Sequence, residues 1–285
     1  MTILVFGRTG QVATELLRLS TARTPVTALG RDLADLTDPV ACAAAIAAHR
    51  PRAVINAAAH TAVDRAETEE ALATRINADA PGAMARACAA ADIPFVQIST
   101  DYVFAGDGTL PRAPDAATGP RQVYGRSKLA GERAVAEAGG RWAVLRTSWV
   151  FSGHGINFLR TMLRLSETRD TLNVVDDQIG GPTPADAIAA ACLRMVDAMA
   201  DTPGPGGLHH LSGAPDTSWK GFAEEIFARA GRHVAVTGIP TAAYPTPAAR
   251  PLNSRLDCTS LRARFGIDRP DWRAGIDRAL AEIAA

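Results

Sequence analysis

The sequence lacks several features that mark whole classes of proteins. Thirty basic residues balance thirty acidic ones, so the formal net charge is zero and no global field would attract nucleic acid or an anionic membrane. No apolar run approaches the roughly 18 residues that a membrane-spanning helix needs. Residues 1–7 carry no basic segment and pass directly into a strand pattern. We therefore expect a cytoplasmic protein with neither nucleic-acid nor membrane partners.

Cysteine and lysine are both scarce. The four cysteines lie far apart and form no CxxC pair, so the sequence suggests neither a disulfide framework nor a zinc site. We expect their side chains to be small buried hydrophobic groups. Only two lysines occur, Lys128 and Lys220, because arginine supplies almost every positive charge. Lysine at position 128 therefore indicates a place that requires a compact ammonium group rather than a guanidinium.

The sequence does contain a regular alternation of two patterns. Short β-rich apolar runs alternate with longer alanine-rich stretches of helical spacing, and 47% of the residues are hydrophobic. This alternation predicts repeated βαβ units, and so an α/β fold with a Rossmann-like, doubly wound parallel sheet. The expected strands are residues 3–6, 26–29, 53–56, 95–99 and 142–147. The expected helices are residues 11–20, 39–49, 69–91 and 124–138.

The alternation of strand and helix patterns becomes less regular after residue 150, which predicts a second region. We expect residues 1–150 to form a dinucleotide-binding domain and residues 151–285 to form mainly a smaller, interleaved substrate-binding region. A helix from about residue 157 to 167 and a strand at 172–175 are expected there. A further apolar run at 208–211 predicts that about 183–212 return to the main sheet.

The first expected strand leads into a glycine-rich turn, residues 7–13 with the sequence GRTGQVA, that opens a helix. Gly7 and Gly10 allow the backbone to turn tightly and to approach a pyrophosphate, whose charge meets the N–H groups at the helix start. This context indicates dinucleotide binding, with an ordinary βα turn as the alternative.

The end of the second strand bears on which dinucleotide is bound. A carboxylate there accepts from the ribose 2′-OH of NAD, whereas a guanidinium favours the 2′-phosphate of NADP. The residues are Gly30, Arg31 and Asp32. Arg31 favours NADPH, and NADH stays possible because Asp32 could accept from the ribose.

Polar residues cluster where the chemistry is expected. The fourth strand ends in Ser99 and Thr100, and a later helix carries Tyr124 and Lys128 four positions apart, on one face. Strand ends in a doubly wound sheet line one crevice, so these groups should meet. We expect the Lys128 ammonium to lower the pKa of the Tyr124 phenol and make it a proton donor near neutral pH.

These groups support the reduction of a carbonyl. The cofactor would deliver hydride, Tyr124 would protonate the oxygen, and a strand hydroxyl would hydrogen-bond that oxygen. Ser99 and Thr100 are rivals for the last role, because adjacent strand residues point to opposite faces. A YxxxK pattern alone could also be a solvated helix surface.

Longer runs carry a family resemblance. They read AAHTAVD at 58–64, STDYVF at 99–104, YGRSKLAGE at 124–132, RTSWVF at 146–151, DQIGGPT at 177–183 and RPLNSRLD at 250–257. With these runs, which cover nearly the whole chain, the sequence resembles the extended short-chain dehydrogenase/reductase family and, within it, the dTDP-4-dehydrorhamnose reductases. The resemblance implies reduction of the 4-keto group of dTDP-4-dehydro-6-deoxy-L-mannose to dTDP-L-rhamnose by NAD(P)H.

The resemblance also implies roles for individual residues. Thr100, rather than Ser99, joins Tyr124 and Lys128 as a catalytic residue. With the glycine-rich turn and the end of the second strand, the expected cofactor contacts are Gly7, Gly10, Gln11, Val12, Gly30, Arg31, Asp35, Leu36, Ala59, His60, Thr61, Tyr124 and Lys128. The expected contacts of the dTDP-sugar are Thr100, Asp101, Trp149 and, on chemical grounds, Arg250, whose guanidinium could pair with a pyrophosphate.

Some relatives are reported to dimerise around magnesium held by carboxylates, while others are monomers. Glu15, Asp186 and Glu282 occupy the corresponding positions, but the short Asp186 side chain disfavours the metal, so we expect no metal and either a monomer or a homodimer. Two other functions stay open: another nucleotide-sugar 4-ketoreductase or epimerase, and a non-catalytic NADP-binding regulatory subunit. The intact Tyr124 and Lys128 pair favours an enzyme.

Overall fold

Six parallel strands form the central sheet of the computed structural model, which describes residues 1–202 and 206–284. Residues 203–205, within the stretch expected to return to the sheet, and residue 285 lie outside the described residues. The strands run in the order β10-β5-β4-β3-β1-β2. They are β1 (Ile3–Phe6), β2 (Val26–Leu29), β3 (Ala53–Asn56), β4 (Phe95–Thr100), β5 (Trp142–Thr147) and β10 (Gly207–Leu211). This order confirms the predicted doubly wound α/β fold.

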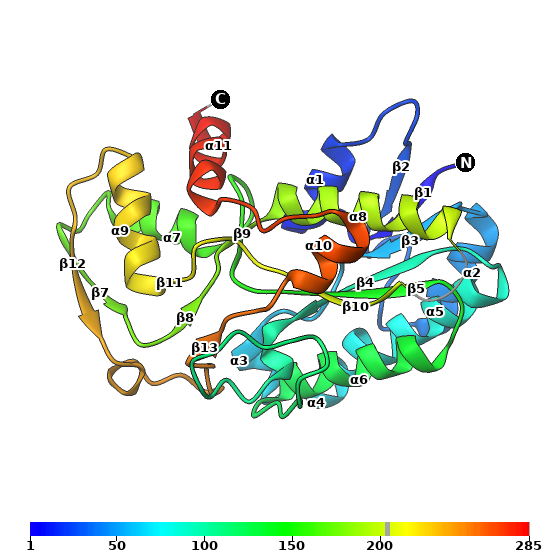
Figure 1. The fold of residues 1–285 in the computed structure, drawn as a ribbon, viewed down its shortest axis with the longest axis horizontal. Coiled ribbons are helices and arrows are strands. Elements are labelled where there is room, and N and C mark those ends of the chain that lie inside the picture. Colours follow the sequence, from blue (N-terminus) through cyan, green and yellow to red (C-terminus); the bar gives the residue numbers. More distant parts are fainter. Residues whose placement is uncertain (203–205, 285) are drawn as a thin grey trace.

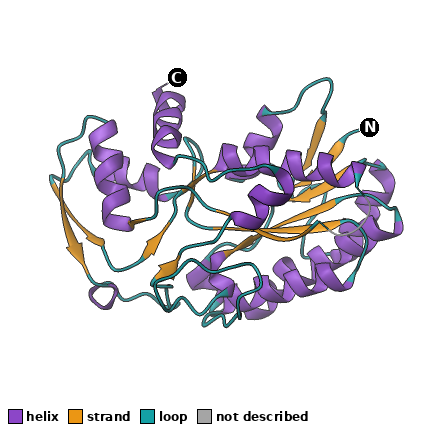
Figure 2. Ribbon diagram, viewed as in Figure 1, coloured by secondary structure: helices purple, strands orange, loops and turns teal. Residues whose placement is uncertain are grey.

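Helices cover both faces of the sheet (Figures 1 and 2). Helices α1 (Gln11–Arg18), α8 (Ala185–Asp201) and α10 (Thr259–Phe265) pack on one face, and α2 (Pro39–His49), α5 (Ala80–Ala90) and α6 (Val123–Glu137) pack on the other. Because strand residues alternate in direction, Ile3 and Val5 join the first core and Leu4 and Phe6 the second. Both faces of the sheet are thus buried, as its near-continuous apolar strands require.

The expected helix over residues 69–91 is helical throughout residues 70–90, with a π-helical turn inside it. Helix α4 (Glu70–Thr74) is followed by a π-helical turn, η1 (Arg75–Asp79), and then by α5. Short helical segments also follow the strand ends, as α3 (Val63–Ala66) after β3 and η2 (Asp101–Val103) after β4. Periodicity did not reveal the π-helical turn, because a single turn is too short to set an apolar period of its own.

The C-terminal part has a core of its own, centred on Phe151, Phe222 and Trp272. It contains α7 (Phe158–Leu165), β7 (Thr171–Val175), α9 (Trp219–Arg229), β12 (Ala235–Ile239) and α11 (Trp272–Ala284). Shorter elements are β6 (Val150–Phe151), β8 (Ile179–Gly180), β9 (Thr183–Pro184), β11 (Thr217–Ser218), η3 (Thr241–Ala243) and β13 (Asn253–Ser254). We call this part the C-terminal unit; the domain boundary at residue 150 stays a prediction.

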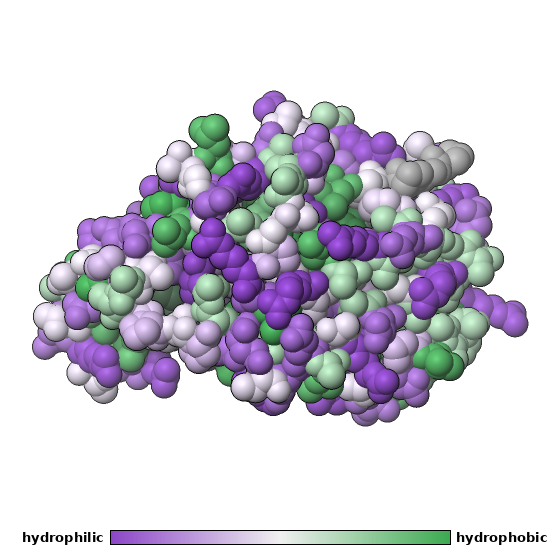
Figure 3. All heavy atoms as spheres, turned by 90° about the horizontal axis from the view of Figure 1, so that it is seen from below, coloured by the Kyte–Doolittle hydropathy of each residue, from purple (hydrophilic) through white to green (hydrophobic). Residues whose placement is uncertain are grey.

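The cysteines, the molecular surface and the helix lengths bear on the expectations from composition. All four cysteines are free and buried, as the sequence analysis expects. Figure 3 shows one face of the molecule, on which hydrophilic and hydrophobic residues are intermingled. Within residues 1–202 and 206–284, no helix combines the length and the apolar character that crossing a bilayer requires.

Candidate active site

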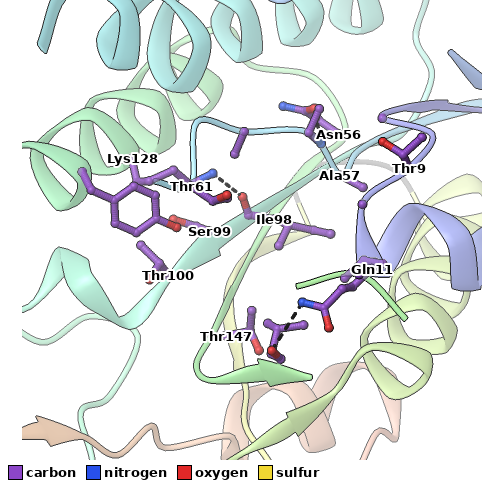
Figure 4. Close-up of a pocket in the computed structure, with 18 of the residues that line it drawn as sticks. Thr9, Gln11, Asn56, Ala57, Thr61, Ile98, Ser99, Thr100, Lys128 and Thr147 are labelled. Carbon is purple, nitrogen blue, oxygen red and sulfur yellow. Dashed lines mark hydrogen bonds between the residues drawn. The ribbon is translucent and has the colours of Figure 1, made fainter. Parts of the chain in front are cut away.

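A cavity of about 910 Å³ lies at the carboxyl ends of β1, β3, β4 and β5, where residues of the glycine-rich turn and of the strand ends converge (Figure 4). A second cavity of about 380 Å³ adjoins it and shares Gly7, Arg31, Ala58, Ala59 and Thr61 with it. Parallel strands bring all their carboxyl ends to one edge, which explains why segments far apart in sequence meet here.

The glycine-rich turn is shaped to hold a phosphate group. Gly7 has a φ of +105°, and a Cβ there would lie 3.3 Å from the backbone of Ala57. Gly10 precedes α1 and provides no side-chain cap, so the first N–H groups of the helix are free to bind an anion. These features fit the pyrophosphate of a dinucleotide, as the sequence predicts.

The expected cofactor contacts divide between the two cavities. Gly10, Gln11, Val12, Gly30, Tyr124 and Lys128 line the larger one, and Asp35, Leu36 and His60 line the smaller one. The remaining four, which line both cavities, are Gly7, Arg31, Ala59 and Thr61. In the smaller cavity the backbone N–H of Thr37 donates to Asp35 at 2.9 Å, which lowers the pKa of that carboxyl group. The loop carrying His60 is held by Asn77 of the π-helical turn, whose Oδ1 accepts from the His60 N–H at 2.8 Å.

Thr100, Tyr124 and Lys128 meet in the larger cavity. The Thr100 hydroxyl donates to Oδ1 of Asp101 at 3.0 Å and lies close enough to the Tyr124 phenol to lower its pKa. The Lys128 ammonium donates to the carbonyl of Ile98 at 2.7 Å (Figure 4). Ser99 turns the other way and donates to Oε1 of Glu132 at 2.5 Å. The structure therefore directs the Thr100 hydroxyl, not that of Ser99, toward the phenol.

The expected acidification of Tyr124 is wrong in this structure. Burial raises the pKa of the phenol, the nearby Thr100 hydroxyl only partly opposes this, and the negative charge of Asp101 raises the pKa further. The Lys128 ammonium is committed to the Ile98 carbonyl, and burial lowers its own pKa to about 8. Desolvation thus outweighs the attraction that spacing on a helix suggests. The phenol therefore keeps its proton at neutral pH and can donate it only to a strong base.

A buried network supports this part of α6 from behind. Arg146 makes two hydrogen bonds to Glu132, at 2.9 and 2.6 Å, and both side chains are almost wholly buried. Asn77 also donates to Ser127 at 3.0 Å, beside Lys128. Because each polar group has a partner, the network anchors the helix that carries Tyr124 and Lys128.

The expected substrate contacts are only partly brought together. Asp101 and Trp149 line the larger cavity, and burial raises the pKa of Asp101 to about 6. Arg250 does not line it, because its guanidinium donates to Asp64 at 2.6 Å. A substrate pyrophosphate would have to compete with this ion pair, so a role for Arg250 in substrate binding stays a proposal.

Sequence reasoning assigned no role to three residues that the structure places at or behind this site. Tyr102 packs edge-on against Tyr124 with ring centroids 5.6 Å apart, and Ile156 is an exposed apolar residue lining the larger cavity. Asn77 acts from behind the cavity wall. Tyr102 could have been found from its place in the STDYVF run, whereas no local pattern marks Ile156 or Asn77.

The three carboxylates considered for magnesium line one small cavity, but among the described residues Asp186 is not in the cluster of ligand atoms that lie within 4.8 Å of one another. Asp186 accepts from Arg278 at 2.7 Å, while Glu15 and Glu282 share the Arg18 guanidinium at 2.9 and 2.5 Å. The ring of His154, rather than Asp186, lies near both glutamates. Because Arg18 already supplies the positive charge between the glutamates, this arrangement does not fit the ion that the resemblance suggests.

The model of one protein family matches the whole chain, residues 1–285, and is described as the RmlD substrate binding domain. A dTDP-4-dehydrorhamnose reductase from Burkholderia thailandensis is 44% identical over 99% of both chains. One from Sinorhizobium fredii is 42% identical over 98% of this chain and 96% of its own.

Solved structures agree with these matches. A dTDP-4-dehydrorhamnose reductase from Clostridium acetobutylicum superposes with a TM-score of 0.94, 34% identity and full coverage of both chains. One from Bacillus anthracis, solved in complex with NADP, has a TM-score of 0.93 and 32% identity over 99% of both chains. On the family model and these relatives, the chain belongs to the dTDP-4-dehydrorhamnose reductase family.

Proposed function

We propose that this protein uses NADPH to reduce the 4-keto group of dTDP-4-dehydro-6-deoxy-L-mannose (dTDP-4-dehydrorhamnose), giving dTDP-L-rhamnose in the final step of its biosynthesis. One observation carries the proposal: Thr100, Tyr124 and Lys128 share a single cavity with a glycine-rich turn suited to a dinucleotide. Curated relatives with this activity in their names match almost the whole chain.

The chain's own residues account for the proton and for the developing charge. The nicotinamide, when bound, supplies the hydride that attacks the carbonyl carbon. Tyr124 donates its phenolic proton to the carbonyl oxygen, and its raised pKa keeps that proton in place until the oxygen becomes basic. Thr100 lies next to the phenol and stabilises the same oxygen. Lys128, still largely an ammonium at neutral pH, holds the nicotinamide ribose.

The charges around the smaller cavity support NADPH as the cofactor. Arg31 lines both cavities, and its side chain is 81% exposed although it lies 3.9 Å from Asp35, so its guanidinium can turn to a 2′-phosphate. The relative from Bacillus anthracis was solved with NADP. The proposal allows NADH as a second cofactor. It also includes a cytoplasmic location and either a monomeric or a homodimeric state.

An assay of NADPH absorbance tests the proposed function. The substrate is dTDP-4-keto-6-deoxyglucose, supplied with and without the 3,5-epimerase that precedes this step. We expect oxidation of NADPH only when the epimerase is present. Oxidation with another 4-keto nucleotide sugar, and none with this pair, would contradict the assignment and favour a related ketoreductase. No oxidation with any such sugar, together with tight NADPH binding, would favour a non-catalytic protein.

A further inference from the structure

Trp149 has an unusual backbone for an aromatic residue. Its φ of +50° lies in the left-handed region, which residues other than glycine adopt only when their surroundings hold them there. Its carbonyl accepts from the N–H of Thr183 at 3.1 Å, and the preceding Ser148 donates to Gly181 at 3.0 Å. Strain of this kind concentrates at functional sites, and Trp149 lines the larger cavity.

The indole of Trp149 is held from two sides. Trp219, the first residue of α9, stacks on it with ring centroids 3.7 Å apart and planes 13° from parallel. A Cβ on Gly180 of β8 would lie 3.0 Å from Cε2 of Trp149, so the ring also lies close to this strand. Together these contacts leave the indole little freedom to turn.

Trp219 is itself fixed by the C-terminal unit. Its Nε1 donates to Gln178 at 3.0 Å, and Gln178 in turn donates to the Thr241 hydroxyl at 3.0 Å. Phe158 packs against its ring with centroids 4.6 Å apart. Trp219 is not among the described residues that line the larger cavity. It therefore reaches the cavity wall by stacking on Trp149.

We propose that Trp219 is a positioning residue: its stacking holds the Trp149 indole in place as a preformed wall for the sugar nucleotide. A wall that is already ordered lowers the entropy cost of binding. This inference rests on the proposed function, because it takes Trp149 to contact the substrate. The glycine-rich turn belongs to β1 and α1, so the binding of NADPH should not depend on Trp219.

Two substitutions at one position test the inference. In Trp219→Ala the stack is lost, and we expect the KM for the dTDP-4-keto sugar to rise about three- to tenfold while the Kd of NADPH is unchanged. Trp219→Phe keeps an aromatic ring and should restore most of the loss. Stacked indoles also give an exciton couplet in the circular-dichroism spectrum, which both variants should lose.

Trp272→Phe is the matched control. Trp272 is buried in the same core, edge-on to Phe222 at 5.5 Å, so its replacement should lower stability but leave the KM and the couplet unchanged. Should Trp219→Ala fail to fold, Trp219→Leu removes the aromatic stack but keeps a large apolar side chain, and it should raise the KM in the same way.

The outcomes separate the two proposals. A KM for Trp219→Ala within about twofold of that of the wild type, or an equal rise in Trp272→Phe, overturns the positioning role alone. A fall in NADPH affinity as large as the rise in KM also overturns it. If the wild-type protein reduces no dTDP-4-keto sugar, the proposed function fails and the inference built on it fails too.

Discussion

At the scale of single residues, the site combines a phenol that keeps its proton with an ammonium that loses its proton easily. Both properties arise from burial, which disfavours the charged form of each group. A neutral phenol is suited to donate a proton to an alkoxide, because the alkoxide is the far stronger base. The proposed reaction therefore does not require the acidified phenol that the sequence suggests.

Tyr124→Phe tests the proton donor directly. We expect kcat to fall by about 10²-fold or more, because the variant removes only the phenolic oxygen, and the Kd of NADPH to change little. Steady-state kinetics and a fluorescence titration with NADPH measure the two quantities. Tyr102→Phe is the control, since it keeps the ring that packs edge-on against Tyr124 and should retain most of the activity. An unchanged kcat in Tyr124→Phe would remove Tyr124 from its proposed role.

Lys128→Met tests whether the buried ammonium group, which the proposed reaction needs, lowers the stability of the fold. Because folding lowers the pKa of Lys128 from 10.5 to about 8, the unfolded chain binds more protons between these values, and the free energy of unfolding rises with pH across that window. Below about pH 8 the full cost applies, on the order of 3 kcal/mol. We expect the variant to melt at a higher temperature at neutral pH and to lose about 10²-fold or more in kcat.

Lys220→Met serves as the comparison for this variant. Lys220 is partly exposed and pairs with Glu224 at 3.2 Å and Asp176 at 3.9 Å, so its loss should change the melting temperature and kcat far less than the loss of Lys128. A melting temperature for Lys128→Met below that of the wild-type protein at neutral pH would show that the buried ammonium stabilises the fold.

At the scale of elements, helix α6 controls the site because it packs unusually close to its neighbours. A Cβ on Gly125 would run into the carbonyl oxygen of Tyr102 in η2, and one on Gly131 into the carbonyl oxygen of Asn77 in η1. Both neighbours belong to segments at or behind the cavity. Small residues on one helix thus let backbone lie against backbone and set the position of Tyr124.

Gly131→Ala tests this close packing. Alanine favours an isolated helix by about 1 kcal/mol over glycine, yet we expect a net loss of about 1–3 kcal/mol, because the added Cβ forces α6 away from the π-helical turn. Denaturant unfolding gives the stability, and kcat should fall with it. Arg133→Ala, at an exposed position of the same helix, should be close to neutral. A stabilised Gly131→Ala variant would contradict the close contact.

At the scale of the whole molecule, a charge cluster joins the two ends of the chain. Arg18 of α1 bridges Glu15 on its own helix to Glu282 of α11, and His154 lies 3.4 Å from Glu15. Burial raises the pKa of Glu15, and the Arg18 charge opposes that shift. The arginine thereby supplies the cation that holds two carboxylates together.

Arg18→Met tests whether the arginine replaces a metal ion. We expect a loss of roughly 1 kcal/mol in stability, partly recovered by Mg²⁺, because two carboxylates then face each other without a cation. The melting temperature of the wild-type protein should respond neither to Mg²⁺ nor to a chelator. Arg23→Met, in an exposed loop, should behave like the wild type. A chelator that lowers the wild-type melting temperature would point to a bound metal.

Much of the architecture was predictable because it depends on local order. Apolar spacing predicted the strands and most helices, and parallel pairing then required Asn56, Thr100 and Thr147 to end at one edge of the sheet. The scarcity of lysine also pointed to Lys128, because a lysine in a chain that otherwise uses arginine indicates a site that requires an ammonium group.

The sequence by itself determined which strand ends and which helix face meet at the cavity, since strand direction and helix spacing are properties of the chain. Only the tertiary structure decided their protonation and their partners. Burial raises the pKa of Tyr124, Asp64 holds Arg250, and Trp219 stacks on Trp149 from a distant helix. Desolvation and partner choice depend on everything that packs around a group, and no local pattern records those neighbours.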